Sequence, residues 1–157
     1  MKASGLFDDA HETLELRAAS SAGEPLNTEV VTWVEKSLGC PVMDHYGQTE
    51  TGMTCNNHHA LDHLKHVGAM GVPMPGYRLA ILDAEYKELP AGEPGVLAID
   101  IKNSPAHFFQ GYTWQEKNPF VEGYYLTGDV VIRNEDGTFQ FAGRDDDIIT
   151  TAGYRVG

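Results

Sequence analysis

The chain has 157 residues, of which 41% are hydrophobic and 22% charged, so it suits one folded domain or a compact piece of a larger enzyme. Its net charge of −12 argues against nucleic acid or an anionic membrane surface as a partner, and no apolar run is long enough to span a membrane. Two cysteines, Cys40 and Cys55, are too few for a disulfide framework or a four-thiolate zinc site. Together with an N-terminus that lacks the apolar core of a secretory signal, they predict a cytoplasmic protein with reduced thiols.

The first part of the chain, residues 1–67, predicts the end of a parallel α/β sheet. Residues 14–19 alternate apolar and polar side chains at first and are expected to form a strand that runs into a buried loop. Pro25 can open a helix, Gly39 fits its C-terminal cap, and a short strand is expected over residues 40–44. In this helix the apolar residues recur at helical spacing: Leu26, Val30, Trp33, Val34 and Leu38.

The second part, residues 68–157, is expected to be mostly β. Its strand candidates are separated by turns rich in proline and glycine and cover residues 77–82, 95–101, 129–133 and 138–142. Residues 134–137 are the expected hairpin loop between the last two strands, because Gly137 is free to adopt a positive φ. Such spacing predicts a small antiparallel sheet or barrel.

Residues 44–52 carry the most chemistry, because acids, an aromatic ring and hydroxyls are crowded there directly after a predicted strand. The segment reads Asp44-His45-Tyr46-Gly47-Gln48-Thr49-Glu50-Thr51-Gly52. Ligands usually bind at the carboxyl ends of the strands in an α/β sheet. A polar turn with solvated acids is the alternative interpretation.

Two later segments place further polar groups beside predicted strands. Asp129 could accept hydrogen bonds from a ribose, although a turn aspartate that bonds its own backbone is the alternative. Arg144 and Arg155 lie in a segment with three adjacent acids and could offer a fork to phosphate, whereas a solvated and partly paired loop is the alternative. The sequence contains no glycine-rich phosphate loop that ends in lysine.

Four ordered motifs resemble those of the AMP-forming acyl-CoA synthetases: Tyr46-Gly47-Gln48-Thr49-Glu50, Thr127-Gly128-Asp129, Gly143-Arg144-Asp145-Asp146-Asp147 and Gly153-Tyr154-Arg155. These enzymes belong to the adenylate-forming superfamily, and the resemblance runs from about Leu16 to Gly157. Gln48 and the ending Gly-Tyr-Arg-Val-Gly look most like the medium-chain acyl-CoA and acetyl-CoA synthetase branch. The resemblance implies an α/β fold that is a fragment of the large N-terminal domain. In it, the end of a parallel α/β subdomain (1–67) precedes a small antiparallel β-barrel-like subdomain (68–157) that ends at the hinge to a C-terminal domain.

The resemblance also implies roles on the adenine and phosphate side of a nucleotide site. Gly23-Glu24-Pro25 looks like the loop along the adenine, Asp44 would lie near the adenine amino group, and Tyr46 would stack on the ring. Thr49 resembles the hydroxyl that binds the α-phosphate, and Glu50 resembles the carboxylate that holds Mg²⁺. These last two are the implied catalytic residues. The implied nucleotide-binding set is completed by His45, Gly47 and Gln48.

On the ribose and coenzyme A side, Asp129 and Arg144 resemble the pair that binds the ribose hydroxyls. Gly153 would lie where coenzyme A approaches the backbone, and Arg155 resembles an arginine that contacts phosphate. Asp146 matches the hinge position about which the C-terminal domain turns.

The implied enzyme activates a carboxylic acid with ATP to an acyl-adenylate and transfers the acyl group to coenzyme A, using Mg²⁺. Acetate-specific members carry a bulky tryptophan at the position of Gly47, so this glycine is expected to leave room for a medium-chain or aryl acid. The family's phosphate loop and its C-terminal domain with a catalytic lysine are missing from the sequence. We therefore expect the isolated chain to be inactive.

Two alternatives stay open at this point. An adenylation domain that loads a carrier protein would have the same motifs, and a non-catalytic nucleotide- or metal-binding module would need neither a phosphate loop nor a catalytic lysine. Histidines spaced three and four residues apart could hold Zn²⁺ if they lay on a helix, although a polar helix or loop is the alternative. These histidines are His58, His59, His63 and His66.

Overall fold

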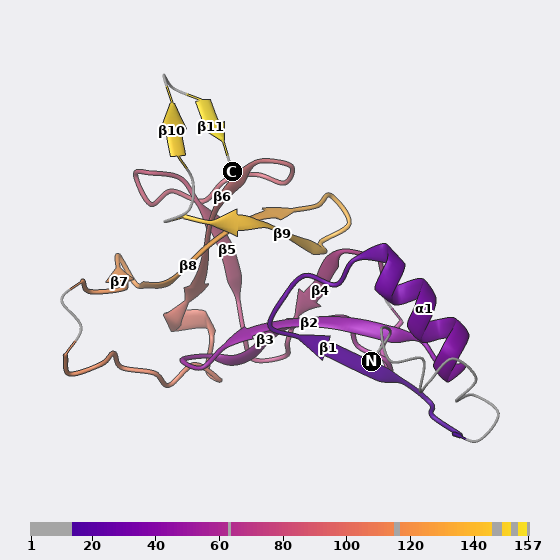
Figure 1. The fold of residues 1–157 in the computed structure, drawn as a ribbon. Helices are drawn as coiled ribbons and strands as arrows, with labels where there is room; N and C mark the ends of the chain where they lie inside the picture. Colours follow the sequence, from indigo (N-terminus) through magenta and orange to yellow (C-terminus); the bar gives the residue numbers. More distant parts are fainter. Residues whose placement is uncertain (1–13, 63, 115–116, 146–148, 152–153, 157) are drawn as a thin grey trace.

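The computed structural model describes residues 14–62, 64–114, 117–145, 149–151 and 154–156 (Figure 1). Figure 1 shows helix α1 beside strands β1 and β2 at one end of the molecule, and β5, β6, β8 and β9 toward the other end. In chain order the elements are β1 (Ala19–Ala22), α1 (Thr28–Leu38), β2 (Val42–Gln48), β3 (Gly52–Asn56), β4 (Ala69–Pro73), β5 (Leu79–Leu82), β6 (Pro94–Asp100), the 3₁₀ helix η3 (Ile101–Asn103), β7 (Phe120–Val121), β8 (Tyr124–Arg133), β9 (Phe139–Arg144), β10 (Ile149–Thr151) and β11 (Tyr154–Val156).

One sheet runs through both predicted parts in the order β1-β2-β3-β4-β9-β8-β6-β5, with β7 beside β8, while β10 and β11 pair only with each other. Strands β1 and β2 are parallel, and every later pair along this order is antiparallel. The predicted combination of a parallel α/β end and an antiparallel β part is therefore confirmed. Because β4 pairs with both β3 and β9, the sheet continues across residue 67, and the division there remains a prediction.

Helix α1 forms over most of the span that the apolar spacing predicted, but it begins at Thr28 after an Asn27 cap and not at Pro25, and Leu26 lies outside it. The Asn27 side chain caps its start by accepting a hydrogen bond from the Val30 N–H at 2.8 Å. Gly39 ends it in the left-handed conformation, with φ of 66°, and donates to the Glu35 carbonyl at 3.1 Å. The buried face of the helix packs Val34 and Leu38 against neighbouring apolar side chains, so α1 covers the parallel end of the sheet.

Two strand boundaries near the N-terminus were predicted wrongly. The first strand does not cover residues 14–19 but begins at Ala19, because pairing with β2 starts there, and Leu14 and Leu16 are 41% and 44% exposed. The second does not end at Asp44 but continues to Gln48, because it turns at Thr49–Thr51 and pairs with β3. The chemical segment of residues 44–52 is thus half strand and half hairpin turn.

The largest hydrophobic core lies in the antiparallel part. Its fully buried members include Leu97, Ile99 and Val131, and Cys55 on β3 packs into the same cluster. Both cysteines are buried and free, as the sequence predicted. In the described part of the chain, no helix has the length and apolar character needed to cross a membrane.

Candidate functional site

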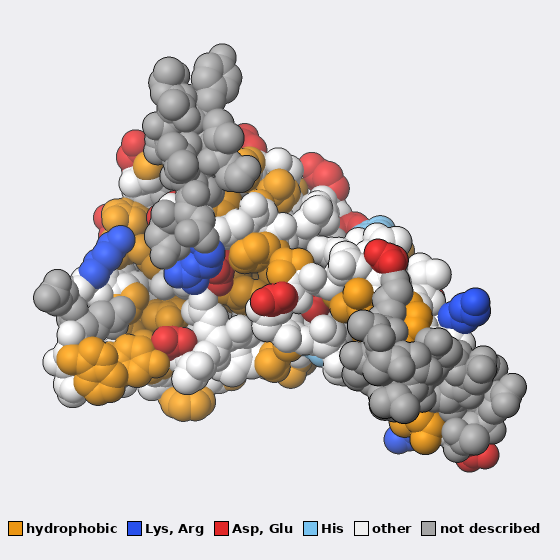
Figure 2. Space-filling model, in the orientation of Figure 1, with side chains coloured by type: hydrophobic (Ala, Val, Ile, Leu, Met, Phe, Trp, Pro, Cys, Tyr) orange, Lys and Arg blue, Asp and Glu red, His pale blue; other side chains and the backbone are white. Residues whose placement is uncertain are grey.

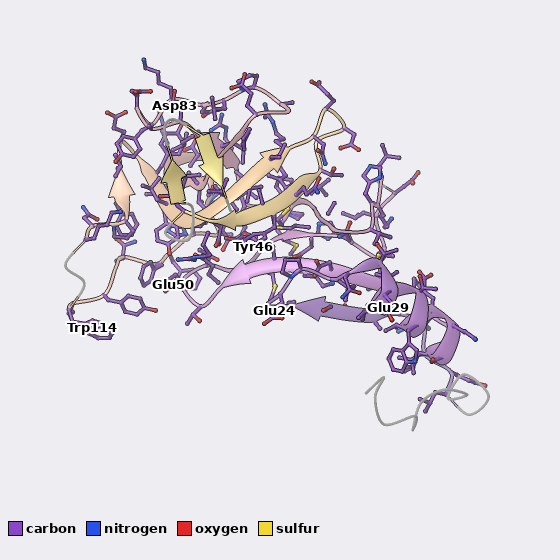
Figure 3. All side chains as sticks on the ribbon, turned by 45° about the horizontal axis from the view of Figure 1, so that its top comes forward. Glu24, Glu29, Tyr46, Glu50, Asp83 and Trp114 are labelled. Atoms are coloured by element: carbon purple, nitrogen blue, oxygen red, sulfur yellow. The ribbon has the colours of Figure 1, made fainter. Side chains whose placement is uncertain are left out.

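A cavity of about 590 Å³ gathers most of the residues predicted to bind a nucleotide. The parallel register sets Ala22 beside His45, so the loop after β1 and the end of β2 meet at one edge of the sheet. Figure 3 labels Tyr46 above Glu24, which lies just after β1, and above Glu50, which lies in the hairpin turn. The predicted residues that line this cavity are Gly23, Glu24, Pro25, Asp44, His45, Tyr46, Gly47, Gln48, Asp129 and Arg144.

Asp129 accepts hydrogen bonds from three side chains that line the cavity. It is 4% exposed, and its Oδ2 accepts hydrogen bonds from the Tyr46 hydroxyl and from Gln48 Nε2, the latter at 2.8 Å. Its Oδ1 accepts from an Arg144 guanidinium nitrogen at 3.0 Å. Asp129 and Arg144 are direct partners in the antiparallel register of β8 and β9, which explains how two motifs far apart in the sequence form one ion pair.

Asp44 is a second buried acid that lines the cavity. It is 8% exposed, and its carboxylate oxygens accept from the backbone N–H groups of Leu26 and His45 at 3.2 and 3.1 Å. Burial raises the pKa of Asp44, while these two hydrogen bonds act against that shift. A buried carboxylate with two backbone donors is held in a fixed place, so it can select a ligand group that donates a hydrogen bond.

Tyr46 lies two residues after Asp44 on β2, and its hydroxyl bonds Asp129. Burial raises the pKa of its hydroxyl, and the adjacent Asp129 carboxylate raises it further, so the group stays protonated and donates. Its ring packs against the main hydrophobic core and lines the cavity. An aromatic face beside a buried acid is a suitable surface for a flat heterocycle.

Thr49 and Glu50 lie in the turn between β2 and β3 and border a second cavity of about 990 Å³. Gln48 and Arg144 line both cavities, so the two spaces adjoin at these side chains. The Glu50 Oε1 accepts a hydrogen bond from the Tyr112 hydroxyl at 3.0 Å. Glu50 fits Mg²⁺, which proteins usually hold through one or two carboxylates while phosphates and water fill the other positions.

Gly153 and Asp146 lie outside the described residues, and Arg155 lies on β11. Sequence reasoning missed the contribution of three tyrosines: Tyr77, Tyr112 and Tyr125. No local signal could have found the hydroxyl partners of Tyr112 and Tyr125, which lie 62 and 77 residues away in the sequence.

Gly47 does not leave the open space that was expected of it. A Cβ atom at this position would lie 2.1 Å from the Gly52 carbonyl oxygen and 2.8 Å from the Met53 Cα. The expectation of a free acyl slot at Gly47 is therefore wrong, because the missing side chain allows β3 to approach β2 at the bulge between Tyr46 and Gly47.

The histidine segment does not form the helix on which a shared metal face would depend. The described residues between Asn57 and Val67 contain no helix, and His63 lies outside them. His66 bonds Asp136 at 2.6 Å, whereas His59 lies 3.4 Å from the Ser20 hydroxyl. Among the side chains that the structure describes, no three histidines, cysteines or acids gather as a metal site.

Comparison with known proteins adds independent findings. The family described as "AMP-binding enzyme" matches residues 2–113. The 4-hydroxybutyrate–CoA ligase 1 of Metallosphaera sedula is 42% identical over 145 residues, which cover 90% of this chain and 25% of that protein. The chain spans about a quarter of the length of the curated relatives it matches.

Two solved structures show the same similarity in three dimensions. The crystal structure of an acyl-CoA synthetase of Brucella canis has a TM-score of 0.79 and 55% identity, and the match covers 90% of this chain and 26% of that one. The crystal structure of the anthranilate CoA ligase AuaEII in complex with anthranoyl-AMP has a TM-score of 0.72 and 27% identity, with 90% and 27% covered.

Proposed function

Because the chain belongs to the AMP-binding enzyme family, we propose that it is part of an AMP-forming acyl-CoA ligase, which activates a carboxylic acid with ATP and passes the acyl group to coenzyme A. Membership confirms the family that the motifs predicted. One observation carries the proposal: Asp44, Tyr46 and Asp129 line the same cavity. Its volume of about 590 Å³ suits a small-molecule ligand.

In this proposal the cavity binds the nucleoside part of ATP. The adenine lies between the 23–25 loop and the Tyr46 ring, with Asp44 accepting from its amino group. Asp129 accepts from the ribose, and Arg144 holds the Asp129 carboxylate in place. The arrangement is supported by the burial of both acids and by the hydrogen bonds that fix them before any ligand binds.

The phosphates and Mg²⁺ belong at the hairpin turn. Thr49 would donate its hydroxyl to the α-phosphate, and Glu50 would hold the cation with one carboxylate oxygen. A bound Mg²⁺ stabilises the negative charge that develops on phosphate oxygens during attack by a carboxylate. The proposal is supported by the position of both residues beside Arg144 on the second cavity.

Coenzyme A is proposed as the acceptor because the named relatives are CoA ligases or acyl-CoA synthetases. A medium-chain or aryl acid remains the proposed substrate class, although the crowding at Gly47 removes the steric argument for it. The cytoplasm remains the proposed location, supported by the two free cysteines.

Equilibrium binding of AMP to the 157-residue chain tests the nucleotide site directly. We expect Asp129→Asn to weaken AMP binding, whereas Asp136→Asn, on the hairpin between β8 and β9, should leave it unchanged. In the enzyme that contains this chain, Asp129→Asn should lower the rate of carboxylate-dependent ATP–pyrophosphate exchange, whereas Asp136→Asn should leave that rate unchanged. Detection of a thioester with coenzyme A would identify the acceptor. A folded Asp129→Asn chain with wild-type AMP affinity would refute the site.

A further inference from the structure

We propose that Tyr112 is a positioning residue for Glu50: its hydroxyl holds one carboxylate oxygen so that the other faces the divalent cation. The inference rests on the proposed function, because it deepens the role of Glu50 in that site. It assigns a task to a residue outside the four motifs, 62 positions from its partner.

Two tyrosine hydroxyls donate hydrogen bonds to the turn that carries Glu50. Tyr112 donates to Glu50 Oε1 at 3.0 Å, and Tyr77 donates to the Thr51 carbonyl oxygen at 2.6 Å. Within the turn, the Gln48 N–H donates to the Thr51 hydroxyl at 3.1 Å. Tyr77 thus fixes the backbone, whereas Tyr112 is the contact that reaches the carboxylate itself.

Tyr112 is held at the turn by an aromatic cluster. Its ring lies edge-on to Phe109 at 5.1 Å, and Phe109 in turn lies edge-on to Tyr125 at 5.7 Å. On its other side Tyr112 stacks with Trp114, whose ring centre is 5.0 Å away. Phe109 packs on the main core, so the segment is anchored there.

The outer face of this segment is exposed. Phe108 and Trp114 are 83% and 77% exposed, and apolar side chains gather at the lower left of the molecule in Figure 2, where Figure 1 places this loop. Packing therefore explains the inward position of Phe109, while the hydroxyl of Tyr112 faces a charged partner.

The chemistry of the pair fits an outer partner of a metal ligand. A carboxylate that binds a cation through one oxygen is commonly hydrogen-bonded through the other, and loss of such a partner typically weakens metal binding about 10–100-fold. The Tyr112 bond occupies Oε1 only, and Glu50 borders the cavity that would hold the phosphates. The hydroxyl bond thus favours one rotamer of the Glu50 side chain over the others.

The test measures cation affinity separately from nucleotide affinity. Free Mn²⁺ is followed by electron paramagnetic resonance as it is titrated into the 157-residue chain with AMP, and AMP affinity is measured in the presence of EDTA. Tyr112→Phe removes only the hydroxyl and should weaken Mn²⁺ binding about 10–100-fold while metal-free AMP affinity stays unchanged. The matched control is Tyr77→Phe, which removes a hydroxyl from the backbone of the same turn and should change Mn²⁺ affinity far less.

The other outcomes overturn the inference in distinguishable ways. Equal Mn²⁺ affinity in wild type and Tyr112→Phe means that the hydroxyl does not position Glu50, and equal losses in both tyrosine variants mean that only the stiffness of the turn matters. If Glu50→Gln binds Mn²⁺ as wild type does, Glu50 is not the cation ligand and the role of Tyr112 falls with it. AMP binding in EDTA then decides independently whether the nucleotide site stands.

Discussion

The Tyr46 hydroxyl donates a hydrogen bond to the Asp129 carboxylate, and this bond joins two residues that lie 83 positions apart in the sequence and line the same cavity. A carboxylate offers about four acceptor positions. Tyr46 and Gln48 use both positions on Oδ2, and Arg144 uses one on Oδ1. The donors from the described residues thus leave one acceptor position on Asp129, so we expect it to bind one ribose hydroxyl without rearrangement and a second only if a present donor leaves.

Substitution of Asp129 by alanine should weaken both folding and nucleotide binding. It leaves the Tyr46 hydroxyl without its acceptor and removes one of the two acceptors of the Gln48 amide, which still bonds the Thr127 carbonyl. Hydrogen bonds to a charged group contribute about 1.5–3 kcal/mol. We expect a loss of about that size in the free energy of unfolding, measured with denaturant, and a fall in AMP affinity of roughly 10–100-fold. Wild-type AMP affinity in a folded variant would contradict the assignment.

Tyr46→Phe should distinguish the contribution of the Tyr46 hydroxyl to stability and AMP binding from that of its ring. The ring that lines the cavity is kept, while Asp129 loses one of its donors. We expect a loss of about 1.5–3 kcal/mol in unfolding free energy but a smaller loss of AMP affinity than in Asp129→Ala. If Tyr46→Phe weakens AMP binding as much as Asp129→Ala does, the Tyr46 ring without its hydroxyl does not suffice as the adenine surface.

Asp136 should make the stability of the chain depend on pH in the acid range. The Thr138 hydroxyl and N–H, at 2.7 and 3.0 Å, and then His66 lower the pKa of Asp136 to about 2 from the ordinary 3.8. A lowered pKa in the folded state means that this group's stabilising contribution is present above pH 3.8 and is lost as pH falls toward about 2.

The melting temperatures of wild type and Asp136→Ala should therefore differ above pH 3.8 and converge as pH falls toward about 2. His66→Gln is the control, because His66 lowers the pKa of Asp136 less than Thr138 does. This variant should show only part of the difference in melting temperature. A constant difference across this range would mean that Asp136 acts through its shape and not through its charge.

Local patterns predicted the elements whose cause is local. The helix 28–38 has its apolar stripe and both caps in its own sequence, and the loop 134–137 has its glycine. The strand at Ala19 was placed too early because an alternation of leucine and glutamate cannot reveal which residues pair with β2. The strand β3 was missed because it follows a turn that the motifs had led us to interpret as a ligand loop.

The candidate site was likewise predicted where its cause is local and missed where it depends on contacts between distant strands. Motifs identified Asp44, Tyr46 and Asp129, but the contact that joins the last two depends on β2 meeting β8 through the folded core. The role of Gly47 was misread for a related reason. A glycine in a sequence signals either open space or close backbone approach, and only the position of the facing strand distinguishes the two.

Substitution at Gly47 should consequently damage the fold and not the choice of acid. Even the Cβ of Gly47→Ala would lie 2.1 Å from the Gly52 carbonyl oxygen, so β2 and β3 must move apart, and such overpacking costs about 1–3 kcal/mol. We expect denaturant unfolding to show a loss of that size, with Thr49→Ala in the same hairpin as the exposed control within about 0.5 kcal/mol of wild type. In the enzyme that contains this chain, Gly47→Trp should lower kcat/KM for acetate and for longer acids alike, because the hairpin that carries Thr49 and Glu50 is displaced. A stable Gly47→Trp enzyme that keeps its rate on acetate and loses it on longer acids would restore the acyl pocket at this position and contradict the packing seen between the two strands.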